Sequence, residues 1–168
     1  MRSEDIKKEM PFYDIVRELQ MTAFPPEERF AMEEILRLSE SNHIEYKSFW
    51  EGNQLCGILF YNIGKTMLYL FYLAVPGTIR SNGYGAQLLQ WLKEMYPDKA
   101  IVGNIESTGL GAANENQRIR RLAFYERNGF HKVPYRLLDD SGLYDIISTG
   151  TTVDETEYLR VSGTVGDK

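Results

Sequence analysis

An almost continuous apolar run, TMLYLFYLAV, occupies residues 66–75 and is followed at once by Pro76-Gly77. Ten residues are too few to cross a bilayer as a helix. A run of this length that ends at a turn signal is typical of a strand buried on both faces of a sheet. We therefore expect residues 66–75 to lie inside a sheet that is flanked by helices.

The segment RSNGYGAQLLQWL, residues 80–92, follows this strand and predicts a glycine turn leading directly into a helix. Apolar side chains at 84, 88, 91, 92 and 95 give the helix a buried stripe, and Pro97 ends it. The first backbone N–H groups of a helix have no intrahelical acceptor, and together with the helix dipole they favour anions such as phosphate. The alternatives are a close approach to another segment of the chain and a plain strand–helix turn.

The remaining elements follow from hydrophobic spacing and from turn residues. Helices are expected over residues 11–23, from Pro25-Pro26 with Glu27 and Glu28 in the first turn, over 84–96 and over 117–127. Strands are expected over residues 46–50, 55–62, 66–75, 99–106, 130–135 and 143–148. This order predicts a mixed α/β fold with a largely antiparallel sheet and one parallel pair beside the glycine-turn helix.

The length of 168 residues predicts a single domain over 1–168, in which 149–168 is a loosely assigned polar extension that forms a short strand or helix. A net charge of −5 argues against a nucleic-acid partner. The one cysteine, Cys56, lies in an apolar run, where we expect a buried and inert thiol in a reducing compartment. The N-terminus lacks the apolar core of a signal peptide, so we expect a cytoplasmic protein with no membrane partner.

Two common phosphate-binding motifs do not match the glycine turn. A P-loop needs Lys followed by Ser or Thr after its last glycine, but Ala86-Gln87 stands there. The dinucleotide fingerprint needs a third small residue where Leu88 lies, although Glu106 is about twenty residues further on, as that fingerprint requires. A dinucleotide-binding protein is therefore kept as a distant alternative.

Three motifs in order resemble the GNAT superfamily of acyl-CoA-dependent N-acetyltransferases. They are LAV at 73–75, the R-x-x-G-x-G turn at 80–85 and FYERNGF at 124–130. AFPPEER at 23–29 is similar to the substrate-side helical region of many members. The resemblance extends over about residues 5–148. It implies the GNAT fold, a central and mostly antiparallel sheet flanked by helices.

The resemblance implies acetyl-CoA, as a co-substrate, along the strand end and the glycine turn. Backbone N–H groups would hold the pyrophosphate, and Val75 would polarise the thioester carbonyl. Many relatives carry Asn where this chain has Arg118, which would bind CoA phosphates or lie on a solvated helix face. The implied cofactor-binding residues are Leu73, Ala74, Val75, Arg80, Ser81, Asn82, Gly83, Tyr84, Gly85, Ala86 and Arg118.

Two residues are the candidates for catalysis. Tyr125 matches the tyrosine that many relatives use to protonate the departing CoA thiolate, and its alternative role is core packing. Glu106, at a strand end, is the candidate base that deprotonates the amine through water, and its alternative is a polar strand end. Glu28 would line the acceptor pocket or cap a helix. His43 and His131 lack the partners of a triad or metal site, so no metal is expected.

The resemblance implies an N-acetyltransferase that moves the acetyl group of acetyl-CoA to a primary amine by direct attack in a ternary complex. Small amines, polyamines, aminoglycosides, amino acids and protein N-termini all stay open as acceptors, and the excess of acidic residues favours a small cationic molecule among them. A homodimer is compatible with the resemblance. The alternative from another class is a catalytically silent acyl-CoA-binding module, which would keep Gly83 and Gly85 but would need neither Tyr125 nor an acceptor pocket.

Overall fold

The computed structural model describes residues 1–26 and 28–163. Within them, seven strands form one sheet in the order β1-β2-β3-β4-β5-β7-β6. The strands are β1 (Arg2–Asp5), β2 (Ile44–Glu51), β3 (Gln54–Ile63), β4 (Met67–Ala74), β5 (Ala100–Glu106), β6 (His131–Asp139) and β7 (Gly142–Ser148). The α-helices are α1 (Tyr13–Ala23), α2 (Met32–Leu38), α3 (Tyr84–Met95), α4 (Glu115–Arg127) and α5 (Glu155–Gly163). The mixed α/β fold expected from the sequence is confirmed.

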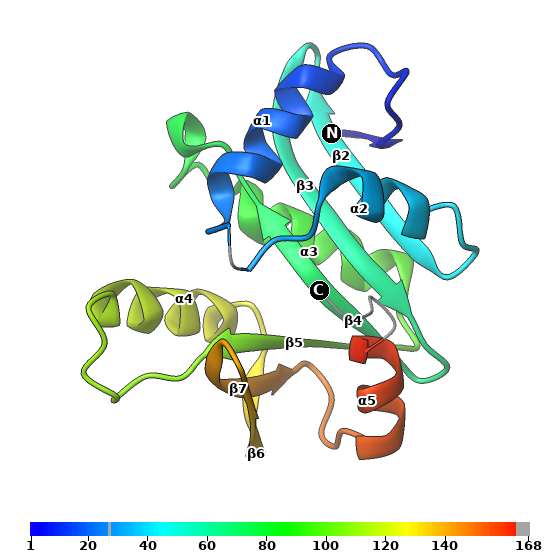
Figure 1. The fold of residues 1–168 in the computed structure, drawn as a ribbon. Coiled ribbons are helices and arrows are strands. Elements are labelled where there is room, and N and C mark those ends of the chain that lie inside the picture. The colour runs from blue at the N-terminus through cyan, green and yellow to red at the C-terminus, as the bar shows by residue number, and fades with distance from the viewer. Residues whose placement is uncertain (27, 164–168) are drawn as a thin grey trace.

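The central feature of the sheet is the pairing of β4 with β5, the one parallel pair among the described strands. Their register covers Met67–Tyr69 opposite Ala100–Val102, and beyond it the two strands diverge (Figure 1). The fold is therefore not the doubly wound parallel sheet that a dinucleotide-binding protein would need. The divergence opens the sheet at the carboxyl ends of β4 and β5.

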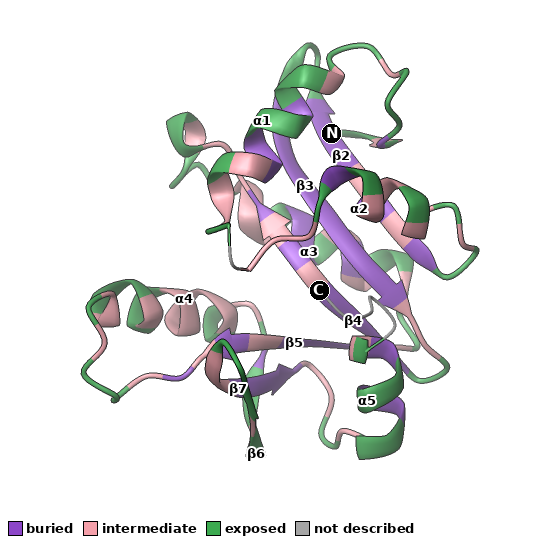
Figure 2. Cartoon of the chain, viewed as in Figure 1, coloured by how far each residue is buried: buried purple, intermediate pink, exposed green. Residues whose placement is uncertain are grey.

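Helices cover both faces of the sheet, and β4 is buried between them, as its apolar sequence predicts (Figure 2). On one face, α1 and α2 pack through Val16 and Ile35, and α5 adds Tyr158 and Val161. On the other face, α3 packs through three leucines, among them Leu88. The sequence pattern and the layered packing therefore agree for β4.

A β-bulge interrupts β4 next to this opening. Phe60 of β3 lies opposite Tyr72 and Tyr61 lies opposite Leu70, so Phe71 is the extra residue. In a regular strand neighbouring side chains point to opposite faces. Here Phe71 and Tyr72 both pack on the face of α1, whereas Leu70 packs on the face of α3. The bulge therefore places two consecutive aromatic side chains on one face.

The helix expected to begin at Pro25-Pro26 is absent there, because α2 begins at Met32. Glu27 lies outside the described residues. The guanidinium of Arg29 donates to the carbonyls of Met21 and Phe24. The Tyr72 hydroxyl accepts from the Phe30 amide and donates to the Glu28 carbonyl, each at 3.0 Å. The Arg29 bonds cap the end of α1, whereas the Tyr72 bonds hold the backbone of Glu28 and Phe30 in a non-helical conformation, which overrides the local helix-start signal.

Two elements near the ends of the chain, β1 and α5, have only weak patterns in the sequence. Residues 2–5, RSED, lack an apolar alternation, yet they pair with the edge of β2 as β1. The segment after Thr149 forms helix α5, one of the two forms expected, and residues 164–168 lie outside the described part. The Glu157 carboxylate of α5 accepts hydrogen bonds from the Thr66 amide and hydroxyl and from the Met67 amide. Helix α5 is thereby fixed to the start of β4.

We predict that Glu157→Gln lowers the free energy of unfolding by about 1–3 kcal/mol at neutral pH, since the amide is a weaker acceptor than the carboxylate. Burial opposes ionisation, but the hydrogen bonds from Thr66 and Met67 hold the pKa of Glu157 below its ordinary value of 4.5. The stability that this charge contributes is therefore fully present above pH 4.5, the ordinary pKa of the group. It is lost as the pH falls through the lowered pKa of the folded state. Urea denaturation at several pH values measures both effects.

The matched control is Glu155→Gln, because Glu155 is an exposed carboxylate on the same helix. We expect this control to change the free energy of unfolding little at any pH. If the loss in free energy of unfolding caused by Glu157→Gln stays the same from neutral to acid pH, the role assigned to the charge is contradicted.

Candidate active site

A cavity of about 860 Å³ lies where β4 and β5 diverge. Its walls come from the second half of β4, the N-terminus of α3, the end of β5, helix α4, the segment between α1 and α2, and the β6–β7 hairpin. Segments far apart in the sequence therefore meet at one opening of the sheet. The volume of the cavity lies within the range of about 300–1,000 Å³ that is typical of sites for small molecules and cofactors.

The glycine turn contributes one wall of the cavity through backbone groups. Gly83 is the N-cap of α3, and no side chain caps this end of the helix. The first intrahelical hydrogen bond joins the Gln87 amide to the Gly83 carbonyl, so the amides of residues 84–86 precede the bonded part of the helix. Tyr84, Gly85 and Ala86 line the cavity. This wall can bind an anion through N–H groups and the helix dipole.

The two glycines of this turn have different structural reasons. Gly83 has a φ of 81°, which side chains other than glycine adopt with strain. A Cβ at Gly85 would lie 3.0 Å from Cζ of Phe124 on α4. Gly85 therefore permits the close approach of α3 and α4, so this glycine serves the packing of two helices.

The end of β4 contributes the second wall, formed by Leu73, Ala74 and Val75. The register with β5 ends at Tyr69, so the edge of β4 beyond this residue faces the cavity instead of a neighbouring strand. An exposed strand edge offers N–H and C=O groups to an extended ligand. Of the residues expected to bind the cofactor, Asn82 and Arg118 are the two that do not line the cavity.

Tyr125 lines the cavity from α4 and packs against two phenylalanines. Its ring centroid lies 5.2 Å from those of Phe124 and Phe130, with edge-to-face geometry. Burial raises the pKa of the Tyr125 hydroxyl, and the positive charge of Arg121 opposes this. The hydroxyl is therefore protonated at neutral pH, so it can act as a proton donor. The catalytic and packing roles are compatible in this position.

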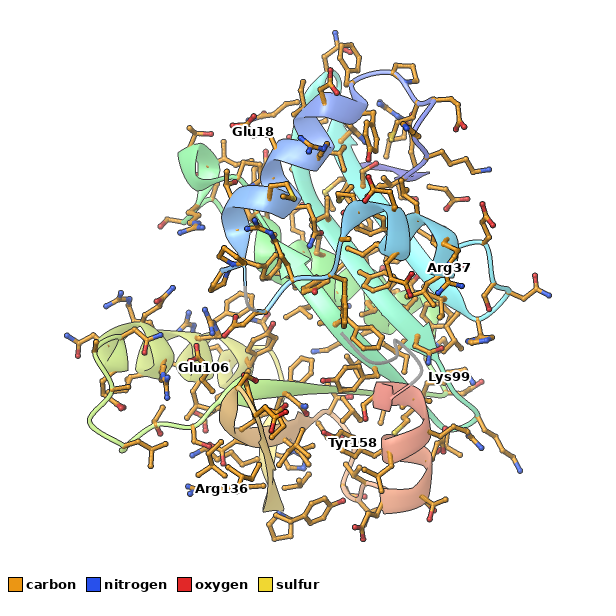
Figure 3. All side chains as sticks on the ribbon, viewed as in Figure 1. Glu18, Arg37, Lys99, Glu106, Arg136 and Tyr158 are labelled. Carbon is orange, nitrogen blue, oxygen red and sulfur yellow. The ribbon has the colours of Figure 1, made fainter. Side chains whose placement is uncertain are left out.

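Glu106 lies at the end of β5 beside α4 (Figure 3). Its carboxylate is 2.6 Å from Nη2 of Arg118 and 3.3 Å from Nη1 of Arg121. Arg118 also donates to Asn114 Oδ1 at 2.8 Å and to the Ser107 carbonyl at 3.1 Å. The Arg118 side chain is 16% exposed, so it is not the solvated side chain that one alternative described. It joins α4 to the end of β5.

Several residues of the cavity were not recognised in the sequence. The aromatic wall, as we name it, consists of Phe24, Phe30, Tyr69, Phe71 and Tyr72. Tyr144 and Asp139 add polar groups from the β6–β7 hairpin, while Arg120, Arg121 and Arg127 add positive charge from α4. Glu28 lines the cavity, as one of its two expected roles required. The density of aromatic residues in TMLYLFYLAV was the available signal, but their common face depends on the bulge.

Among residues 1–26 and 28–163, no group of three or more His, Cys, Asp and Glu side chains could hold a metal ion. His43 bonds to Asn62, with 2.7 Å between Nδ1 and Oδ1. Cys56 is a buried free thiol that faces the Gln54 carbonyl, as expected for a structural cysteine. None of the described helices combines the length and the apolar character needed to cross a membrane.

A model of the family described as Acetyltransferase (GNAT) family matches residues 12–130. The chain belongs to this family. It is therefore a GNAT acyltransferase, and the family resemblance expected from the three sequence motifs is confirmed. The matched span contains α1 through α4 and every residue of the glycine turn.

Solved structures of GNAT proteins share the fold. A putative GNAT-family acetyltransferase from Bacteroides thetaiotaomicron has 22% identity and a TM-score of 0.75, with 96% of this chain and 93% of that chain covered. An aminoglycoside 6′-N-acetyltransferase complexed with coenzyme A has 16% identity and a TM-score of 0.66, covering 92% and 100%. The ribosomal-protein-S18-alanine N-acetyltransferase from Escherichia coli has 13% identity and a TM-score of 0.64, covering 91% and 95%. No curated protein matches the chain in sequence.

We predict that Gly85→Ala destabilises the GNAT fold by about 1–3 kcal/mol, since the added Cβ overpacks the ring of Phe124. In a Phe124→Leu background this cost should fall, because the ring that the Cβ meets has been removed. Gly83→Ala is the matched control, with a cost of about 1–2 kcal/mol from backbone strain that is the same in both backgrounds. Denaturation of the single and double variants gives the coupling energy of each glycine substitution with Phe124→Leu. If Gly85→Ala costs the same free energy of unfolding with and without Phe124→Leu, the prediction is contradicted.

Proposed function

We propose that the chain works as a single N-acetyltransferase domain that moves the acetyl group of acetyl-CoA to a primary amine of a small cationic acceptor. The amine attacks the thioester directly while both substrates are bound. One observation carries the proposal. The uncapped amides of α3, the unpaired edge of β4, Tyr125 and Glu106 all border the same cavity. A co-substrate and an acceptor can therefore meet there.

The walls of the cavity fit acetyl-CoA. The amides at the start of α3 suit the pyrophosphate, and the β4 edge at residues 73–75 suits the amide groups of the pantetheine arm. Arg80 and three arginines of α4 line the same cavity and favour an anionic co-substrate. The similar aminoglycoside acetyltransferase is described as a complex with coenzyme A. The Val75 N–H, directly after β4, would stabilise the oxyanion that forms from the thioester carbonyl.

Tyr125 is the proposed general acid. Expulsion of CoA leaves negative charge on its sulfur, and a proton from the phenol neutralises it. The raised pKa keeps this proton on Tyr125 until the thiolate forms. The edge-to-face contacts with Phe124 and Phe130 hold the ring in one orientation. A fixed donor lowers the cost of aligning the proton transfer.

Glu106 is the proposed base, acting on the ammonium group of the acceptor through water. Its carboxylate forms ion pairs with Arg118 and Arg121. The same contacts give it a second role, since they hold α4 against the end of β5. Three measurements on a Glu106 variant distinguish the possible roles of this residue. They are the pH dependence of the rate for a base, KM for an electrostatic attraction, and the melting temperature for a structural bridge.

The test of the proposed function is Tyr125→Phe, assayed by release of the CoA thiol in the presence of amines. We expect kcat to fall about ten- to a thousandfold, because water can replace the phenol in part. The rise in melting temperature caused by acetyl-CoA should stay unchanged, since Tyr125 acts on the leaving group. Tyr135→Phe, outside the cavity on β6, is the control and should keep kcat. If Tyr125→Phe retains full activity, the ring serves only for packing.

For Glu106→Gln we expect the rate to fall most at neutral pH and to recover as the pH rises, because free amine becomes abundant without a base. An attraction for the acceptor would instead raise KM, and added salt would weaken the effect. A bridge between α4 and β5 would lower the melting temperature and leave the pH profile unchanged. Glu126→Gln, an exposed carboxylate on α4, is the control.

A further inference from the structure

The sheet forks where β4 and β5 stop pairing, and Tyr69 and Val102 are the last opposite residues before this fork. Both side chains pack in one cluster with Tyr158, so they face the α5 side of the sheet. Asn104 follows two residues after Val102, and β5 pairs regularly with β7 over this stretch, so its side chain lies on the same side. Tyr69 and Asn104 are therefore neighbours at the fork, and both line the cavity.

Tyr158 of α5 contacts both of these residues. Its hydroxyl donates to Asn104 Oδ1 at 2.7 Å, and its ring centroid lies 6.0 Å from that of Tyr69 (Figure 3). This hydrogen bond uses the amide oxygen of Asn104 and leaves the nitrogen, Nδ2, for another partner. An amide nitrogen donates two hydrogen bonds and accepts none. Asn104 therefore keeps its donors in an amide group that α5 orients.

The donors of Asn104 and Tyr69 are unused within the described part of the chain. Neither Asn104 Nδ2 nor the Tyr69 hydroxyl forms a hydrogen bond with a described residue. Neither atom is among the polar side-chain atoms that are buried without a partner, so each touches accessible space. Burial raises the pKa of the Tyr69 hydroxyl well above its ordinary value of 10.0, so this group keeps its proton and can donate it. Two donors at the fork are therefore available to a ligand.

The surroundings of these donors favour a carbonyl oxygen as their partner. Tyr69 is only 7% exposed, and the ring of Phe71 lies 4.7 Å from its ring, so little water reaches the hydroxyl. A polar group in such a place costs free energy until it is hydrogen-bonded. A carbonyl oxygen has two lone pairs and no hydrogen, so it accepts bonds without needing an acceptor in return. A hydroxyl group would add a hydrogen that needs a partner of its own.

The fork lies close to the proposed base. Glu106 follows two residues after Asn104, and the regular pairing of β5 places both side chains on one face of the strand. Residues at this spacing are about 7 Å apart along a strand. A molecule whose amine and carbonyl are joined by a short chain can therefore reach Glu106 and the fork at the same time.

We propose that Tyr69 and Asn104 bind a carbonyl oxygen of the acceptor, and that Tyr158 is the positioning residue that orients Asn104. The acceptor is then an amine with an amide or carboxylate group a few bonds from its nitrogen. This inference rests on the proposed acetyl transfer and narrows the class of its acceptor. It also gives α5 a role in the reaction, although α5 lies outside the residues that the family model matches.

The test compares kcat/KM for thiol release from acetyl-CoA with β-alaninamide, β-alanine and butylamine. The first carries an amide carbonyl, the second carries a carboxylate, and butylamine has neither. Each value is calculated on the concentration of unprotonated amine, because a carbonyl group lowers the basicity of a nearby amine. We expect the better carbonyl compound to exceed butylamine by at least about tenfold, since butylamine leaves both donors unpaired. The identity of that compound shows whether the acceptor carries an amide or a carboxylate.

Three variants connect this ratio to the fork. Tyr69→Phe removes one donor and keeps the ring, so it should narrow the ratio about threefold or more. Asn104→Asp keeps an oxygen that accepts from Tyr158 but replaces the donor nitrogen, so it should narrow the ratio at least as much. Tyr158→Phe should also narrow it, although its hydroxyl bonds to Asn104 and not to the ligand. Tyr135→Phe, outside the cavity on β6, is the control and should leave the ratio unchanged.

Butylamine separates these effects from a general loss of structure. In Tyr69→Phe and Tyr158→Phe its kcat/KM should stay within about twofold of the original value, because butylamine has no oxygen at the fork. An equal fall for butylamine and the better carbonyl compound in both variants would show that the two hydroxyls serve only the packing, which contradicts the proposal.

The remaining outcomes separate this inference from the function on which it rests. Equal kcat/KM for all three amines would overturn the carbonyl site and leave acetyl transfer intact. A carbonyl preference that persists in both Tyr69→Phe and Asn104→Asp would exclude the fork as its cause. If the preference is lost in these two variants but kept in Tyr158→Phe, the positioning role of Tyr158 is wrong. If none of the three amines releases thiol, the proposed transfer to a small amine fails, and this inference fails with it.

Discussion

The divergence of β4 and β5 after three paired positions is the constraint on which the rest of the structure depends. A sheet with complete pairing would satisfy the backbone of β4 and close the opening. The register ends at Tyr69 and Val102, and residues 71–74 and 104–106 of the two strands border a cavity. That cavity joins the α3–α4 side of the sheet to the side of α1, α2 and α5.

Helix α4 is held to this opening at two places. Its Phe124 lies against Gly85 at the start of α3, and its Arg118 and Arg121 pair with Glu106 at the end of β5. The same helix carries Tyr125, so these contacts determine where the phenol lies. Positions that look like ligand-binding residues in the sequence, Gly85 and Arg118 among them, also serve this packing. Substitution of either residue would therefore disturb the placement of α4.

The elements with strong periodic patterns could be predicted from the sequence. The buried β4, the amphipathic α3 and the glycine turn between them are local features, since a few neighbouring residues determine them. The motifs at 73–75, 80–85 and 124–130 were sufficient to indicate the GNAT family, which the family model confirms. The predicted start of the second helix was wrong, because the Tyr72 hydroxyl bonds to the backbone of Glu28 and Phe30 through tertiary contacts that the local sequence does not show.

The sequence by itself determined the order of the elements, the glycine turn at the start of α3 and the acidic, aromatic-rich composition from which the site is made. The tertiary structure decided which of these residues meet. The bulge at Phe71 turned Phe71 and Tyr72 to one face, and the fold brought Asp139 of the β6–β7 hairpin to the same cavity. It also paired Glu106 with two arginines. Strand register and contacts between distant segments decide these features, and local periodicity carries no information about either.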